Sequence, residues 1–161
     1  GRAYADLSQE QLQLSAATDM GALLLDGLGD GIFIAAENCG SYQSVNSLAF
    51  GILQASRTRI SKTEYISCPS CGRTLFDLQE TTAKIRKETS HLKGLKIGIM
   101  GCIVNGPGEM ADADYGYVGT GKGKITLYKE QTVVEKNISE EKAVTALIDL
   151  IKEHGDWVER K

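Results

Sequence analysis

Three cysteine residues and one glutamate are spaced so that together they could hold a metal centre. Cys68 and Cys71 form a C-x-x-C pair, Cys102 follows after thirty residues, and Glu109 follows after six more. Deprotonated cysteine sulfur is the usual ligand of iron–sulfur clusters. A shell of three sulfurs and one oxygen leaves one iron with an exchangeable ligand, which is where substrate chemistry can occur. The set therefore favours an iron–sulfur cluster with one unusual corner.

Other interpretations of the C-x-x-C pair stay open at this point. Structural zinc would need a second closely spaced pair of cysteines or a histidine partner. The nearest histidine, His91, has no second cysteine or histidine close to it in the sequence. A thioredoxin-like dithiol needs no third cysteine, although Gly72 and Arg73 do precede a helical stretch. Unbridged structural thiols are a further alternative. The fourth cysteine, Cys39, lies in a polar loop and is interpreted as a bystander thiol.

The segment around Cys102 favours the cluster over these alternatives. Residues 100–109 read MGCIVNGPGE, with two glycines around a proline. Such a turn is rigid and exposed, and its backbone N–H groups can approach a cluster closely. The segment therefore has the composition of a loop that carries chemistry, and not of a stretch that fills a core.

The two motifs together resemble those of a known enzyme family. Residues 65–73 (YISCPSCGR) and 101–109 (GCIVNGPGE) are similar to the cluster-binding domain of the hydroxymethylbutenyl-diphosphate synthases, enzymes of the methylerythritol phosphate route to isoprenoids. The resemblance is dense over about residues 60–155 and looser before them. It implies that Cys68, Cys71, Cys102 and Glu109 are the four ligands of a 4Fe-4S cluster.

The resemblance also implies a reaction and partners. Such an enzyme opens 2-C-methyl-D-erythritol 2,4-cyclodiphosphate to hydroxymethylbutenyl diphosphate by a two-electron reduction, with ferredoxin or flavodoxin as the electron donor. Glu109 would be the displaceable oxygen ligand, and Asn105 would orient the substrate oxygen or tune the cluster by a hydrogen bond. The alternative hypothesis is a stand-alone electron-transfer or metal-sensing module, which would gain nothing from a displaceable ligand.

Composition limits the remaining possibilities. The chain has 161 residues, of which 42% are hydrophobic, and a net charge of −3. Because charges of both signs are mixed along the chain, nucleic acid and anionic membranes are not expected as main partners. No apolar run approaches the length of a membrane span. We expect a soluble, cytoplasmic protein, or a plastid protein in a plant-like source, and the start without methionine is compatible with removal of an upstream segment.

From residue 63 onward the pattern predicts a small α/β domain with a mixed sheet around both motifs. The resemblance implies the cluster domain also known from sulfite and nitrite reductases. The predicted strands cover 64–66, 95–99, 115–118, 124–128 and 132–135, and the predicted helices run from Leu75 to about Ser90 and from Ser139 to about Gly155. The strand at 95–99 delivers Cys102 just past its end. The Gly-rich stretch 116–123 is interpreted as a hairpin turn because a strand follows it.

Before residue 60 the pattern predicts too few strands to close a sheet. Helices are expected at 12–17 and around 45–53, and strand-like runs at 22–25 and 31–35. We interpret residues 1–60 as the C-terminal part of a barrel-like insert domain plus a linker, and 61–161 as the cluster-binding domain.

Two residues of the first segment assign it to the longer, plant-like type of the family. Phe33 and Ala35 stand where shorter members carry a basic residue and a serine that hold substrate phosphates. The resemblance therefore implies a non-catalytic insert, with the catalytic barrel upstream. The substrate would be bound jointly with that missing barrel, and this fragment alone is expected to be inactive. Its exposed strand edges are expected to promote self-association.

Overall fold

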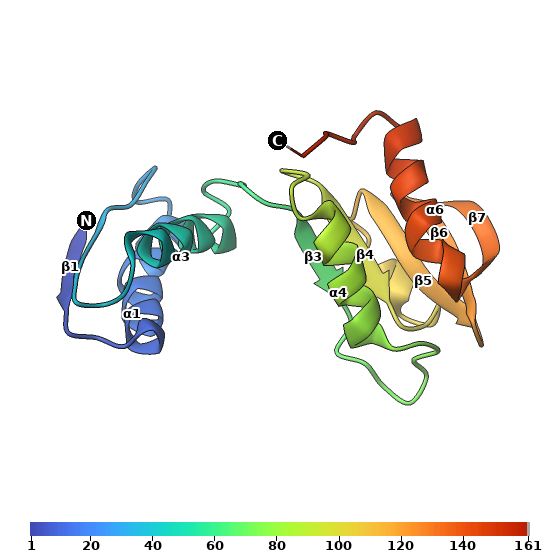
Figure 1. The fold of residues 1–161 in the computed structure, drawn as a ribbon, viewed down its shortest axis with the longest axis horizontal. Coiled ribbons are helices and arrows are strands. Elements are labelled where there is room, and N and C mark those ends of the chain that lie inside the picture. The colour runs from blue at the N-terminus through green and yellow to red at the C-terminus, as the bar shows by residue number, and fades with distance from the viewer. Residues whose placement is uncertain (161) are drawn as a thin grey trace. The chain divides into compact units, whose positions relative to one another are not determined.

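Two units divide the chain, the first from Gly1 to Ser61 and the second from Lys62 onward. The computed structural model describes residues 1–160, and Figure 1 follows the chain through their helices and strands. No helix in this described range is long and apolar enough to cross a membrane. The second unit contains every cysteine except Cys39 and is described first.

The second unit is built on a five-stranded mixed sheet. Its strands lie in the order β3-β4-β5-β6-β7, parallel from β3 to β5 and antiparallel from β5 to β7. They span Glu64–Ser67 (β3), Lys96–Met100 (β4), Tyr115–Gly121 (β5), Lys124–Lys129 (β6) and Thr132–Ser139 (β7). The fold is therefore α/β with a mixed sheet, as the sequence predicts, and the Gly-rich stretch belongs to the hairpin of β5 and β6.

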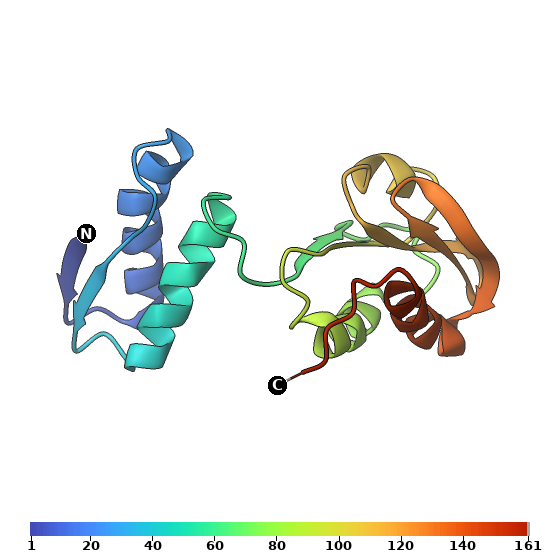
Figure 2. The ribbon, with the colours of Figure 1, turned by 90° about the horizontal axis from the view of Figure 1, so that it is seen from above.

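Two helices cover one face of this sheet and complete the main core (Figure 2). Helix α4 (Leu78–Thr89) begins after Asp77, whose side chain accepts the backbone N–H of Glu80. Helix α6 (Glu140–Glu153) begins after Ser139, the N-cap position that the sequence predicts. Alternate residues of β4, β5 and β6 point into this core, as strand geometry requires. Its fully buried members include Ile85, Ile97, Ile99, Tyr115, Tyr117, Leu147 and Ile151.

The opposite face of the sheet carries the short helix α5 (Gly106–Glu109) and the residues around it (Figure 2). The side chain of Met110 lies over Gly98 in β4 and Gly116 in β5, which are paired across the two strands. A Cβ atom would lie 2.6 Å from Met110 Cβ at Gly98 and 2.5 Å from Met110 Cε at Gly116, which is closer than such atoms approach. The two glycines therefore leave the space in which α5 and the segment after Cys102 pack on the sheet.

The first unit contains two parallel strands, β1 and β2, with a long helical segment between them and a helix after them. The bounds are Arg2–Ala5 (β1), Gln9–Ala16 (α1), Ala17–Gly21 (the π-helical turn η1), Ala22–Leu25 (α2), Ile34–Glu37 (β2) and Tyr42–Ala55 (α3). Ser8 and Gln11 form a reciprocal capping box at the start of α1. The core of this unit is small and consists of Ala16, Met20, Leu24, Ile52 and Leu53, with partly buried neighbours.

Two sequence predictions for the first unit are wrong. Residues 22–25, expected to be strand-like, form helix α2, and the strand expected at 31–35 begins only at Ile34. A short apolar run is compatible with either structure, and the periodicity of its surroundings decides between them. The buried face of the helical segment repeats every four residues, at Leu12, Ala16, Met20 and Leu24. Strand β1 is not predicted from the sequence at all.

Candidate metal centre

Two neighbouring parallel strands position Cys68 and Cys102. Cys68 directly follows β3, and Cys102 lies two residues beyond the end of β4. The carboxyl ends of parallel strands meet at one edge of a sheet, where α/β folds usually place their sites. The backbone N–H of Gly101 donates a hydrogen bond to the Cys68 sulfur, with an N···Sγ distance of 3.3 Å. The structure thus places the Cys68 sulfur beside the peptide that leads into Cys102.

Hydrogen bonds hold the turn that carries Cys71. The backbone N–H of Cys71 donates to Thr74 Oγ1 at 3.0 Å, and the N–H of Thr74 donates to the Cys71 carbonyl at 2.9 Å. The hydroxyls of Ser70 and Thr74 are 3.1 Å apart. The N–H of Leu75 donates to the carbonyl of Gly101 at 3.1 Å. Hydrogen bonds therefore stabilise the turn internally and also connect it to the end of β4.

The surroundings of the exposed Cys71 favour its thiolate. The pKa of this thiol is lowered, chiefly by a hydrogen bond from the backbone N–H of Arg73 and next by one from the Arg73 side chain. The thiolate is the form of cysteine that binds metals. Arg73 thus stabilises the state of Cys71 that a metal centre requires.

The turn before α5 and the helix itself carry the other two predicted site residues, Asn105 and Glu109. Both side chains are exposed. The backbone N–H of Glu109 donates to the Asn105 carbonyl at 3.0 Å, which closes the single turn of α5. The preceding Ile103 and Val104 are 51% and 59% exposed. An exposed carboxylate on such a short helix can approach or leave a metal without disturbing the core.

The predicted ligands do not meet at one point. Within residues 1–160, no three side chains of His, Cys, Asp or Glu lie close enough together to hold a metal ion. A 4Fe-4S cluster does not require its ligands to converge on a single ion, because each ligand binds a different iron atom. The ligand set of Cys68, Cys71, Cys102 and Glu109 therefore stays a prediction.

The chemistry of the donors fits a cluster. The three predicted sulfur ligands are free thiols, two of them half-buried and one exposed, and the Cys68 sulfur accepts the backbone N–H of Gly101. Hydrogen bonds to sulfur and solvent exposure are the properties that tune clusters. Cys39 differs, because it belongs to the first unit and is 2% exposed. Its sulfur accepts the N–H of Leu7 and donates to the carbonyl of Glu37.

Two residues that shape the site, Thr74 and Gly119, are not predicted from the sequence. Thr74 stands three positions after Cys71, and this spacing of a hydroxyl residue in a turn is only a weak signal. Gly119 in β5 lies against the end of β4, since a Cβ atom there would be 2.5 Å from the Gly101 carbonyl oxygen. Because this contact joins segments that are distant in the sequence, no local pattern reveals it.

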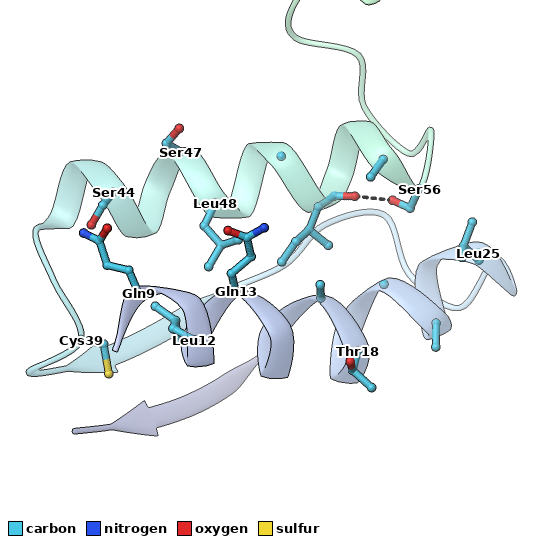
Figure 3. Close-up of a pocket in the computed structure, with 16 residues that line it drawn as sticks. Gln9, Leu12, Gln13, Thr18, Leu25, Cys39, Ser44, Ser47, Leu48 and Ser56 are labelled. Atoms are coloured by element: carbon cyan, nitrogen blue, oxygen red, sulfur yellow. Dashed lines mark hydrogen bonds between the residues drawn. The ribbon is translucent and has the colours of Figure 1, made fainter. Parts of the chain in front are cut away.

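A separate groove of about 780 Å³ lies in the first unit between α1 and α3 (Figure 3). The side chains of Gln9, Gln13 and Leu48 project into the space between the two helices. No acidic or basic side chain is among the described residues that line it. Binding of a diphosphate relies on cationic side chains or converging N–H groups. The described lining of the groove therefore offers no cationic side chain to such a substrate.

The second unit matches a known protein family. The family described as the GcpE protein C-terminal domain matches residues 64–153. This range includes all four predicted ligands and extends from the start of β3 to the end of α6.

Similar proteins extend this match into the first unit. The chain is 64% identical over 157 residues to the 4-hydroxy-3-methylbut-2-en-1-yl diphosphate synthase (flavodoxin) of Bacteroides fragilis, which is 98% of this chain and 25% of that protein. Identity to the protein of the same name from Parabacteroides distasonis is 66% over 157 residues, which is 98% of this chain and 26% of that protein. The protein of Oryza sativa subsp. japonica named 4-hydroxy-3-methylbut-2-en-1-yl diphosphate synthase (ferredoxin), chloroplastic, is 56% identical over 153 residues. This match covers 95% of this chain and 20% of the rice protein. The chain thus spans about a quarter of the length of these bacterial relatives.

Proposed function

Because the chain belongs to the family of the GcpE protein C-terminal domain, we propose that it is the cluster-binding C-terminal part of a 4-hydroxy-3-methylbut-2-en-1-yl diphosphate synthase. The observation that carries the proposal is the contact between the two cysteine loops. The Cys68 sulfur accepts the N–H of Gly101 at 3.3 Å, so the C-x-x-C motif and the Cys102 segment share one edge of the sheet. A stand-alone C-x-x-C site would need no such contact.

In this proposal Cys68, Cys71 and Cys102 hold a 4Fe-4S cluster as thiolates, and Glu109 provides the fourth ligand. When bound, such a cluster supplies electrons together with a Lewis-acidic iron. The N–H of Gly101 donates a hydrogen bond to the Cys68 sulfur, and Arg73 stabilises the Cys71 thiolate. Glu109 lies on an exposed turn, where its carboxylate would be a hard oxygen ligand that a substrate oxygen could replace. Asn105 is exposed in the same turn and would orient that oxygen.

The proposed substrate is 2-C-methyl-D-erythritol 2,4-cyclodiphosphate, bound jointly with a catalytic barrel outside this chain. The relatives' names specify flavodoxin or ferredoxin, and one of these would donate the two electrons. The two cysteine loops, residues 65–73 and 100–109, contain a single basic residue, Arg73. This supports a division of labour in which the cysteine loops supply redox chemistry and the missing barrel holds the phosphates.

We further propose that the first unit is the C-terminal part of a barrel-like insert domain. Its parallel strands β1 and β2 are joined through a helical segment, which is the repeating unit of α/β barrels. Parallel sheets normally have both faces covered. Here Leu25 and Phe33 are 71% and 70% exposed, as expected for a part separated from its neighbouring strands.

The spectrum of one iron site tests the proposed function. The full chain and its Glu109→Ala variant would be reconstituted anaerobically with iron and sulfide, and their Mössbauer spectra compared. We expect the variant to keep part of its cluster and to change the signal of one iron, because only the carboxylate-bound iron loses its ligand. Glu135→Ala removes an exposed carboxylate from β7 and is the matched control. Identical spectra for Glu109→Ala and the wild type in every redox state would contradict the assignment and favour a stand-alone module.

A further inference from the structure

Thr74 joins the cysteine turn to the end of strand β4. Its Oγ1 accepts the backbone N–H of Cys71 at 3.0 Å, while its own N–H donates to the Cys71 carbonyl at 2.9 Å. The pair of bonds closes a ring around the chain from Cys71 to Thr74. In the next residue, the N–H of Leu75 donates to the Gly101 carbonyl at 3.1 Å. Thr74 thus stands between the two loops that carry the predicted sulfur ligands.

The same hydroxyl steadies an unfavourable backbone conformation. Ser70, the residue before Cys71, has a φ of +68°, a left-handed value that costs non-glycine residues free energy. The Ser70 hydroxyl lies 3.1 Å from Thr74 Oγ1. This hydrogen bond helps the C-x-x-C turn to keep a shape that its own sequence disfavours.

Close packing fixes the position of Thr74 relative to β4. A Cβ atom at Gly101 would lie 2.7 Å from Thr74 Oγ1 and 2.9 Å from its Cγ2, so the threonine side chain rests directly on the glycine. Gly101 in turn rests on Gly119 of β5, as described above. Glycines at both positions allow the turn, the end of β4 and β5 to stack at this edge of the sheet. Any movement of Thr74 would therefore shift the turn relative to Cys102.

We propose that Thr74 is a positioning residue that holds Cys71 in place for the metal centre. This inference rests on the proposed function of the cysteine loops. Thr74 does not ligate the metal. It acts through the backbone of Cys71, whose thiol is otherwise exposed at the end of a strained turn. By fixing that backbone, Thr74 reduces the entropy that is lost when three sulfurs from two loops must bind one cluster.

Two variants separate the hydroxyl of Thr74 from its methyl group. Thr74→Val keeps the shape that rests on Gly101 and removes the hydrogen-bond acceptor. Thr74→Ser keeps the acceptor and removes the methyl group. The first readout is hydrogen exchange of the Cys71 amide in the full chain without metal, measured by NMR. We expect exchange to be about two- to tenfold faster in Thr74→Val, the range given by the loss of one net hydrogen bond, and near wild type in Thr74→Ser.

The second readout is the rate at which the reconstituted chain loses iron to a chelator. We expect faster iron loss in Thr74→Val, wild-type behaviour in Thr74→Ser, and one shared melting temperature for the metal-free proteins, because the turn lies outside the core. Unchanged Cys71 exchange in Thr74→Val, or equally fast exchange in both variants, would overturn the inference. Equal iron loss in all three proteins would overturn it as well.

The design distinguishes this inference from the proposed function. A wild-type chain that takes up no iron would contradict the proposed function, whereas the amide exchange would still show whether Thr74 fixes Cys71. Gly101→Ala provides an independent variant, because its added Cβ must displace the Thr74 side chain. We expect it to accelerate Cys71 exchange as Thr74→Val does, and normal exchange in Gly101→Ala would count against the proposed packing.

Discussion

The two units of the chain bury their apolar residues to very different degrees. In the second unit Ile85, Ile97 and Leu147 are 0% exposed, within a core formed by the sheet and helices α4 and α6. In the first unit Leu25 and Phe33 are more than two-thirds exposed, at 71% and 70%. Both units have a buried core, but that of the first unit contains five buried residues, whereas the main core of the second contains fifteen.

The sheets of the two units explain this difference. Two helices cover one face of the five-stranded second sheet, and residues of β4, β5 and β6 are fully buried beneath them. The first unit has two parallel strands, and a two-stranded sheet is marginal in water. Burial on folding must exceed the cost in conformational entropy. From this comparison we expect the first unit to be less stable by itself than the second.

Separating the two units at Lys62 is expected to change cooperative unfolding more than any single substitution described below. We expect residues 62–161 to unfold cooperatively as a monomer, and residues 1–61 to lose their cooperative fold, because only the former carries a complete core. Circular dichroism during heating would measure both. Sedimentation would show self-association of the full chain through the exposed apolar residues of its first unit, and its absence in residues 62–161. Equal monomeric behaviour of the two chains would refute this expectation.

A pair of leucine truncations tests the same contrast within the intact chain. Leu147→Ala is expected to lower the free energy of unfolding of the second unit by about 3 kcal/mol, because it opens a cavity in a fully buried site. Leu24→Ala, its counterpart in the core of the first unit, should leave that transition unchanged, since the two leucines belong to separate core clusters. Chemical denaturation followed through the fluorescence of Trp157, the single tryptophan of the chain, which packs against the core of the second unit, measures both. A comparable shift from Leu24→Ala would mean that the two units share one cooperative core.

Substitution of a glycine beneath α5 is expected to lower the stability of the second unit somewhat less than Leu147→Ala does. Gly98→Ala would place a Cβ atom 2.6 Å from Met110 Cβ, and we expect this overpacking to cost about 1–3 kcal/mol and to displace α5. Gly108→Ala is the matched control, because nothing lies within 4 Å of its Cβ position. Thermal denaturation of the variants measures the difference. If Gly98→Ala were as stable as Gly108→Ala, Met110 would not be held over the paired glycines.

Replacing each of two tyrosines of strand β5 by phenylalanine should change the free energy of unfolding in opposite directions. Both are 0% exposed, but the Tyr115 hydroxyl donates to Asp156 at 2.7 Å, whereas the Tyr117 hydroxyl has no partner among the described residues. We expect Tyr115→Phe to destabilise the second unit by about 1 kcal/mol, and Tyr117→Phe to stabilise it by up to about 1 kcal/mol. Urea denaturation of the two variants decides this. A loss of stability in Tyr117→Phe would indicate that its hydroxyl is hydrogen-bonded in solution.

Much of the second unit can be predicted from its sequence. The alternation of Leu95, Ile97 and Ile99 with Lys96 and Gly98 predicts strand β4, and Cys102 lies just past its end, as expected. Ser139 begins α6, and Gly155, with a φ of +79°, follows its end. Helix α4 begins at Leu78, three residues later than expected. The Asp77 and Glu80 spacing is the local signal that marks this start.

The features that are not predictable depend on contacts between distant segments. Helix α5 is only four residues long, and it packs on the sheet because Met110 lies over a glycine pair from two other strands. The role of Thr74 depends on Gly101, which no periodicity connects to it. In the first unit the apolar run at 22–25 favours neither helix nor strand by itself. The four-residue repeat of the preceding segment determines its structure.

The iron and sulfide content of cysteine variants tests the central claim most directly. After anaerobic reconstitution, the wild-type chain and Cys39→Ser should both contain about four irons, as expected for a 4Fe-4S cluster. Cys102→Ser should contain far less, because one of three sulfur ligands is missing. Cys39 is the matched control, since it is a buried thiol of the first unit. Full iron content in Cys102→Ser, or its loss in Cys39→Ser, would contradict the assignment of the metal centre to the cysteine loops of the second unit.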